Sequence, residues 1–135
     1  MKKVMHKLFL AATLTVFFLC SCEKEPGEGG NSTIFGKVYV KDYNGTFTVL
    51  NGVYYGPDED VYIIYGDDKT YSERVSTNYD GVYEFKYLRP GKYTIYAYSK
   101  DSTLLSPSGL IEKTKEVEIT EKGQEIEVPD IIIFN

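Results

Sequence analysis

Residues 78–98, NYDGVYEFKYLRPGKYTIYAY, decide how this chain folds. Asp80-Gly81 and Pro90-Gly91 are turn signals, because glycine adopts positive φ without strain and proline fixes φ at the first corner of a turn. Apolar and polar side chains alternate on both sides of the second turn, as in strands with one buried face. The stretch therefore predicts a hairpin of strands 82–88 and 92–100. Its inward-facing residues are Tyr83, Phe85, Leu88, Tyr93, Ile95 and Ala97.

The same two-residue period recurs along most of the chain. Further strands are predicted at 34–42, 61–65, 71–78, 115–120 and 125–134, and Pro129 interrupts the last of them. No window shows a helical period, and the strands are rich in Tyr, Val, Ile and Thr, in line with β propensity. We therefore predict an all-β fold, a single antiparallel β-sandwich of about seven strands. Residues 43–57 are an insertion that forms either an extra hairpin or a long loop.

Three segments of the chain resemble a known group of domains. The segments are IFGKVYVKD (34–42), DVYIIYGDD (60–68) and STNYDGVYEFKYLRPGKYTIYAY (76–98). They resemble the prealbumin-like domains, also called carboxypeptidase regulatory-like or CnaB-like β-sandwiches. The matching positions are Gly36, Val38, Thr77, Gly81, Tyr83, Phe85, Pro90, Gly91 and Tyr93. The resemblance implies an Ig-like sandwich but no single function, because such domains serve as stalks, spacers, adhesin modules and glycan-system accessories.

The N-terminus is typical of an exported protein. Residues 1–21 hold three lysines and an apolar run over residues 8–19, which is the pattern of a secretory signal peptide. The end of this segment, Leu19-Cys20-Ser21-Cys22, resembles the lipobox of bacterial lipoproteins, which implies cleavage before Cys22 and lipidation of its thiol. Several acyl chains on one cysteine give stable anchoring. We therefore expect Cys22 to attach the mature chain to a membrane.

Residues 22–33 are predicted to be a tether, and residues 34–135 the sandwich domain. The tether is acidic, contains Pro and Gly, and offers no apolar side chain to a core before residue 34. Glu23 and Glu25 behind the lipidated cysteine resemble the export signal of some Gram-negative surface lipoproteins. We expect an outer-membrane lipoprotein at the cell surface, with the periplasmic face as the alternative.

Signal removal would limit the chemistry of the mature chain. Cys20 and the only histidine, His6, leave with the signal, so catalysts and metal centres that need a free Cys or a His are excluded. Loss of three lysines changes the formal charge from −5 to −8, and only Arg74 and Arg89 remain as arginines, which disfavours a nucleic-acid partner. We predict neither an enzymatic activity nor a cofactor.

Charged residues suggest two further sites, an isopeptide bond and a calcium site. The isopeptide bond of some CnaB-like domains needs a buried acid, but Glu84, the candidate acid beside Lys37, Lys41 and Asn135, alternates with inward residues and is predicted to face solvent. Carboxylates suit Ca²⁺, and a hairpin arrangement would bring four of them to one end of the sandwich. Those residues are Asp58, Asp60, Asp80 and Asp101. Their sequence spacing matches no known calcium loop, and acids that cap turns explain them more simply.

Outward-facing tyrosines are the candidate binding residues. Tyr39, Tyr62, Tyr96 and Tyr98 form an exposed aromatic surface if their strands are neighbours. Such a surface binds glycans by stacking or partner proteins by contact area. The lack of tryptophan counts against a glycan, and packing on a neighbouring domain or plain β propensity also explains the residues. In addition, Asp101-Ser102-Thr103 resembles an O-glycosylation sequon of some Gram-negative gut bacteria, with Ser102 as acceptor.

The hypothesis that follows is a non-catalytic, lipid-anchored cell-envelope protein that binds a partner protein or glycan, or acts as a spacer. The alternatives are a fimbria-like assembly subunit that pairs through an exposed strand edge, and, less well supported, a hydrolase with paired carboxylates.

Overall fold

The structure, a computed structural model, describes residues 24–135. The expected signal peptide (1–21) and the expected lipidation site Cys22 lie outside the described residues. Regular structure in the described part is β-strand, and no helix there is long and apolar enough to cross a membrane. The strands are β1 (Glu28–Tyr43), β2 (Leu50–Tyr55), β3 (Asp60–Tyr65), β4 (Glu73–Ser76), β5 (Val82–Leu88), β6 (Gly91–Lys100), β7 (Leu110–Ile119), β8 (Glu125–Glu127) and β9 (Ile131–Phe134).

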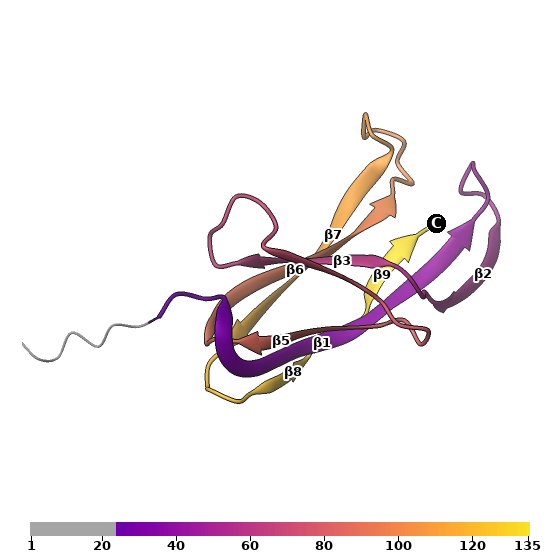
Figure 1. Ribbon diagram of the computed structural model, residues 1–135. Coiled ribbons are helices and arrows are strands. Elements are labelled where there is room, and N and C mark those ends of the chain that lie inside the picture. Colours follow the sequence, from indigo (N-terminus) through magenta and orange to yellow (C-terminus); the bar gives the residue numbers. More distant parts are fainter. Residues whose placement is uncertain (1–23) are drawn as a thin grey trace, which may run out of the picture.

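A five-stranded sheet is built around the long strand β1. On one side, β5 pairs antiparallel with the first part of β1 and β2 pairs antiparallel with its last part. Val38 joins the two pairings, because its N–H donates to the Gly81 carbonyl and its carbonyl accepts from the Gly56 N–H. On the other side, β8 and β9 run parallel to β1 in succession (Figure 1). The last two strands of the chain thus return to pair with its first strand.

A four-stranded antiparallel sheet, in the order β4-β3-β6-β7, packs on the first sheet. The alternation that predicted the 78–98 hairpin is confirmed, since its six inward side chains are each at most 2% exposed. The core residues are Ile34, Val38, Val40, Val61, Ile63, Tyr83, Phe85, Leu88, Tyr93, Ile95, Ala97, Ile119, Val128, Ile131 and Ile133. The predicted all-β sandwich is therefore confirmed, with nine strands in the described part instead of about seven, and its core is complete within residues 34–133.

The two turns within residues 78–98 have the geometry that their sequences predict. Gly81 adopts φ 75°, and the Asn78 side chain accepts hydrogen bonds from the backbone N–H groups two and four residues later, at 2.9 and 3.0 Å. A Cβ on Gly81 would lie 2.8 Å from the Cβ of Tyr55. Gly91 adopts φ 147°, and a Cβ there would collide with the ring of Pro26. Both glycines are required by conformation and by close packing.

The boundary predicted for the tether needs a correction. Strand β1 begins at Glu28, six residues before the predicted domain boundary, and the chain already packs on the sandwich at Pro26 and Gly27. The Gly27 N–H donates to the Tyr93 hydroxyl at 2.9 Å, and the Gly27 carbonyl accepts from the Arg89 N–H at 2.9 Å. Most of the predicted tether therefore packs against the sandwich. Gly29 and Gly30 allow this, because without side chains their backbone can lie close to Leu88 and Arg89.

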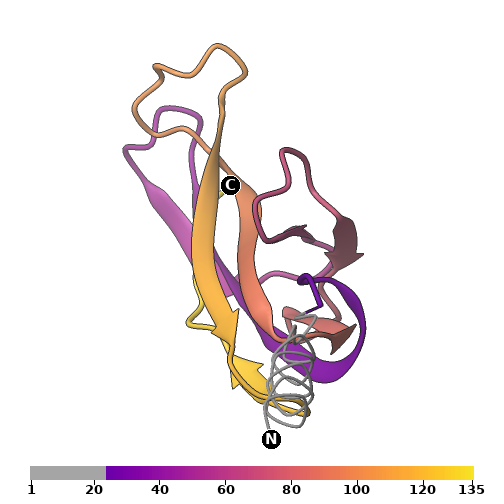
Figure 2. The ribbon, with the colours of Figure 1, turned by 90° about the vertical axis from the view of Figure 1, so that its left-hand side faces the viewer.

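The insertion at 43–57 is a hairpin. Residues 44–49 form its turn, in which the Asn44 side-chain oxygen accepts from the Thr48 N–H at 2.8 Å and from the Val49 N–H at 3.1 Å. Strand β2 then returns along β1. This turn and the 101–109 loop lie at one end of the sandwich, and the docked segment at Pro26 lies at the other (Figures 1 and 2).

Candidate binding surface

Three of the four predicted tyrosines meet on the outer face of the four-stranded sheet. Tyr62 on β3 is the direct cross-strand partner of Tyr96 on β6, and Tyr98 follows two residues later on the same face. The rings of Tyr62 and Tyr96 are stacked, with centroids 4.9 Å apart and an interplanar angle of 9°. Tyr98 contacts both rings edge-on, at centroid distances of 5.6 Å. These strands are neighbours, as the candidate surface requires.

A fourth tyrosine joins the three. Tyr71, in the loop between β3 and β4, packs edge-on against Tyr62 with a centroid distance of 5.0 Å. Tyr71 lies outside the predicted set, because the strand predicted over residues 71–78 begins, in the structure, only at Glu73. The four residues Tyr62, Tyr71, Tyr96 and Tyr98 are called the tyrosine cluster below.

The cluster combines a rigid base with exposed rings. Tyr96 is 6% exposed, whereas Tyr98 and Tyr71 are 41% and 53% exposed. Burial, followed by the influence of Tyr98, raises the pKa of Tyr96 to about 12, so this hydroxyl stays protonated at physiological pH. Edge-on and stacked contacts fix ring positions at about 0.5–1.5 kcal/mol per pair beyond buried area. Tyr98 is therefore held in place by the buried Tyr96 and by Tyr62, and Tyr71 is held by Tyr62.

Polar side chains border the cluster on both sides. Across β6, Thr114 lies opposite Tyr96 and Glu112 lies opposite Tyr98 on β7. On the other side, Arg74 of β4 is the partner of Tyr62 and forms a 3.5 Å ion pair with Asp60. The face therefore offers aromatic rings beside hydroxyl, carboxylate and guanidinium groups.

Tyr39 does not join the cluster, which corrects the predicted set. It lies on β1 in the five-stranded sheet, where its ring packs edge-on against Tyr55 at 5.3 Å. The Nζ atom of Lys37 lies 4.8 Å from the centroid of the Tyr55 ring. The Tyr55 hydroxyl donates to Asp130 at 3.0 Å, and this bond raises the pKa of Tyr55. Alternation shows that Tyr39 points outward but not which sheet its strand enters.

The acids considered for calcium do not form a cluster. Within residues 24–135 no group of three or more Asp, Glu, His or Cys side chains is arranged to hold a metal ion. Asp60 is engaged by Arg74 and by the Ser76 hydroxyl at 3.0 Å, and Asp58 and Asp80 are exposed. Asp101 already accepts hydrogen bonds from backbone N–H groups of its own loop. The hairpin arrangement thus does not bring the four carboxylates together.

Asp101 organises the 101–109 loop. Its side chain is buried and accepts from the backbone N–H groups of Thr103, Leu105 and Ser106 and from the Thr103 hydroxyl. These bonds, the Thr103 hydroxyl foremost, lower the pKa of Asp101 to about 2. Ser102, the candidate O-glycosylation acceptor, is exposed in the same loop. The loop is an Asp-capped turn, and an exposed serine in it is sterically compatible with modification.

Two other acids bear on catalysis and cross-linking. Glu84 is exposed and pairs with Lys86 at 3.6 Å, so it is not the buried acid that an isopeptide bond needs. Glu59 is half-buried, and burial, with Asp60 beside it, raises its pKa. Asp60 is tied to Arg74, so the two neighbours do not present a free carboxylate pair to a substrate.

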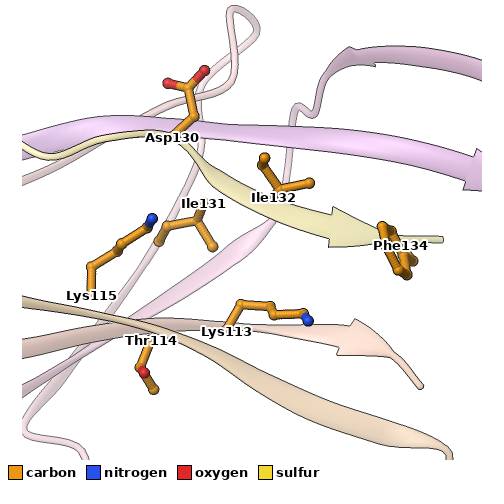
Figure 3. Close-up of a pocket in the computed structure, with 7 residues that line it drawn as sticks. All are labelled: Lys113, Thr114, Lys115, Asp130, Ile131, Ile132 and Phe134. Atoms are coloured by element: carbon orange, nitrogen blue, oxygen red, sulfur yellow. The ribbon is translucent and has the colours of Figure 1, made fainter. Parts of the chain in front are cut away.

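A groove of about 250 Å³ lies where β7 faces β9 (Figure 3). Lys113 and Lys115 line one side and Ile131 lies between the strands, while the carboxylate of Asp130 points away from the lysines. Lys113 lies 5.7 Å from the centroid of the Phe134 ring. The groove offers two ammonium groups over an apolar floor, and none of the predicted site residues lines it.

Comparison with known proteins adds little to this geometry. The chain matches none of the protein-family models and none of the curated protein sequences with which it was compared. Among solved structures, it is similar to a "putative carbohydrate binding protein" from Pseudomonas aeruginosa, with a TM-score of 0.46 and 14% sequence identity over 81% of this chain and 91% of that chain. A likeness this distant carries no inference about what the present chain binds.

Proposed function

We propose that this protein is a non-catalytic lipoprotein of the bacterial cell envelope, and that its prealbumin-like sandwich binds a glycan through the tyrosine cluster. The observation that carries the proposal is the cluster itself. Two well-exposed rings, Tyr71 and Tyr98, are fixed by contacts with Tyr62, and Tyr98 also packs on the buried Tyr96. Rings held in this way lose little conformational entropy when a ligand stacks on them.

The size of the cluster favours a glycan over a protein partner. A fully exposed aromatic side chain offers roughly 150–250 Å², so two half-exposed tyrosines offer an area in the low hundreds of Å². That area matches one or two sugar rings, whereas a stable protein interface buries about 800 Å² on each partner. Glu112 and Thr114, beside the rings on β7, supply hydrogen-bonding groups for sugar hydroxyls.

The remaining parts of the proposal rest on the sequence. The lipobox around Cys22 supports a lipid anchor, and Glu23 and Glu25 support export to the outer face of the outer membrane. The lack of histidine after His6 and the engagement of Asp60 and Asp101 by their neighbours support a role without catalysis.

The binding proposal is tested with residues 24–135, which contain the whole core. A glycan array identifies the best oligosaccharide, and calorimetry then measures its affinity. Tyr98→Ala and Tyr71→Ala are each expected to weaken binding about 3- to 10-fold, because one stacking contact contributes roughly 0.5–1.5 kcal/mol. Tyr79→Ala is the matched control, since Tyr79 is 91% exposed but lies in a separate turn.

Three outcomes would contradict the glycan assignment. The first is an array without signal. The second is an equal loss of affinity in the Tyr79 control. The third is capture of a protein partner that the Tyr98 and Tyr71 variants release, which would make the cluster a protein interface.

A further inference from the structure

Strand β2 forms a free edge of the five-stranded sheet. Its strand partner in the described part of the chain is β1 alone, so alternate residues of β2 direct their N–H and C=O groups away from the sheet. Its apolar side chains are exposed on both faces. They are Leu50, Val53, Tyr54 and Tyr55, each between 42% and 49% exposed. An exposed, apolar strand edge is a template for pairing with another chain.

The charges that usually protect such an edge are missing here. Residues 44–57 contain no charged side chain, in a chain of which 26% of residues are charged. The long edge strand of the other sheet, β7, carries Glu112, Lys113, Lys115, Glu116 and Glu118 along its ten residues. Charged side chains on an edge oppose pairing with a second strand. The edge strand β7 thus carries the charges that oppose pairing, whereas the edge strand β2 does not.

Gly52, in the middle of β2, adds an independent observation. Its backbone does not adopt a positive φ, and a Cβ built on it would meet no atom within 4 Å. The pairing with β1 shifts by one residue at this point, from Asp42 opposite Gly52 to Tyr43 opposite Leu50, so Gly52 lies at a bulge of β2, where glycine is common. Because Gly52 has no side chain, the middle of the β2 edge is open to the backbone of another strand.

We propose that β2 pairs antiparallel with β2 of a second copy of this chain, which joins the two five-stranded sheets into one. Copies of the chain without residues 1–21, with a formal charge of −8, repel each other, so a contact between them is most favourable at a surface without charge. The uncharged 44–57 hairpin provides that surface. Antiparallel pairing of a strand with itself is two-fold symmetric and closes after two copies. In this arrangement apolar residues meet apolar residues, and no like charges face each other.

The test measures association of residues 24–135 by analytical ultracentrifugation from about 10 μM to about 1 mM, a range suited to a small interface. The wild-type domain is expected to form a reversible dimer, and added salt is expected to increase the dimer fraction by screening the repulsion between acidic copies. Hydrogen exchange provides a second readout, because outward-facing amides of residues 50–55 should become protected as concentration rises.

Val53→Lys is expected to abolish the dimer, since Val53 is 46% exposed on the edge strand and lysine there restores the missing protection. Ile132→Lys is the matched control, because Ile132 is 44% exposed on the far edge strand β9 of the same sheet. If circular dichroism shows that Val53→Lys is unfolded, Leu50→Lys is used in its place.

Four results would overturn the proposal. They are a wild-type domain that stays monomeric up to about 1 mM, a dimer that survives both β2 substitutions, an equal loss in Ile132→Lys, and a dimer without protection in 50–55. A β2 edge that pairs only with a different protein would appear as the monomeric result. None of these measurements depends on glycan binding.

Discussion

At the residue scale, Asp101 shows how one side chain can be assigned several roles from sequence and only one from structure. The sequence allowed a calcium ligand, part of a glycosylation sequon or a turn cap. In the structure both carboxylate oxygens accept hydrogen bonds from residues two to five positions ahead. The loop from 101 to 109 therefore depends on the ionised form of this carboxylate.

Asp101→Asn is expected to lower stability and to reduce its dependence on acid pH. The pKa of Asp101 is lowered in the folded state to about 2, below the value of about 3.9 for an unperturbed aspartate. Between these values the unfolded state binds more protons, so the wild-type protein loses this contribution as pH falls from about 4 towards 2. The melting temperature, followed by circular dichroism from pH 5 to pH 2, should fall less steeply in Asp101→Asn than in wild type.

Asp80→Asn is the control for this measurement, because Asp80 is exposed in a turn of similar composition. Its acid profile should follow the wild type. Parallel profiles for wild type and Asp101→Asn would show that the hydrogen bonds of Asp101 do not favour its ionised form.

At the element scale, the 78–98 hairpin could be predicted and the first residues of β1 could not. Gly81, Pro90 and Gly91 mark the turns, and the alternation between them fixes which side chains face inward. Residues 28–33 contain Gly, Asn, Ser and Thr, which read as a linker. Their pairing depends on distant partners: the Ser32 hydroxyl donates to the Glu121 carbonyl and accepts from the Gln124 N–H, both at 3.2 Å. Hydrogen bonds between residues so far apart in the chain produce no repeating pattern in the sequence.

The candidate site was predictable to a similar degree. Tyr62, Tyr96 and Tyr98 follow from alternation on strands that are indeed neighbours. Tyr39 obeys the same alternation, but the order of strands in space placed it on the other sheet. Tyr71 lies in a loop, where no period indicates which way a side chain points. The local sequence thus indicates which side chains point outward, whereas the order of the strands in the sheets decides which of these side chains lie together.

The hydroxyl of one residue, Tyr93, holds the first residues of the domain against the sandwich. It accepts from the Gly27 N–H at 2.9 Å and donates to the Arg89 carbonyl at 2.6 Å. Tyr93→Phe is expected to cost about 1–3 kcal/mol in the free energy of unfolding, because two buried backbone groups lose a partner. Denaturant unfolding measures this loss, and faster hydrogen exchange at Gly27 should accompany it.

Tyr79→Phe, a substitution at an exposed ring, should change neither quantity. Unchanged exchange at Gly27 in Tyr93→Phe would mean that the remaining contacts dock this segment, namely the Arg89 N–H with the Gly27 carbonyl and Pro26 with Gly66 and Gly91.

At the scale of the whole molecule, the docked segment sets how far the sandwich lies from its proposed anchor. Only residues 23–25 separate Cys22 from Pro26, so an extended connection spans roughly 14 Å at about 3.5 Å per residue. The turn at 44–49 and the loop at 101–109 lie at the opposite end (Figures 1 and 2). A chain anchored at Cys22 would hold these two segments away from the membrane and keep the β2 edge accessible to a neighbouring copy.

The anchor itself is tested in cells of a lipoprotein-processing bacterium that are fed a fatty acid with a detectable label. Cys22→Ser should abolish labelling of the full-length chain, because the proposed acceptor thiol is gone. Cys20→Ser should remain labelled, since Cys20 is expected to leave with the signal peptide. Trypsin applied to intact cells should release the labelled protein's sandwich by cleavage after Lys24, the only Lys or Arg between Cys22 and Pro26. Labelling that survives in Cys22→Ser would contradict the anchor, whereas labelled protein that resists trypsin until the outer membrane is opened would place the domain on the periplasmic face.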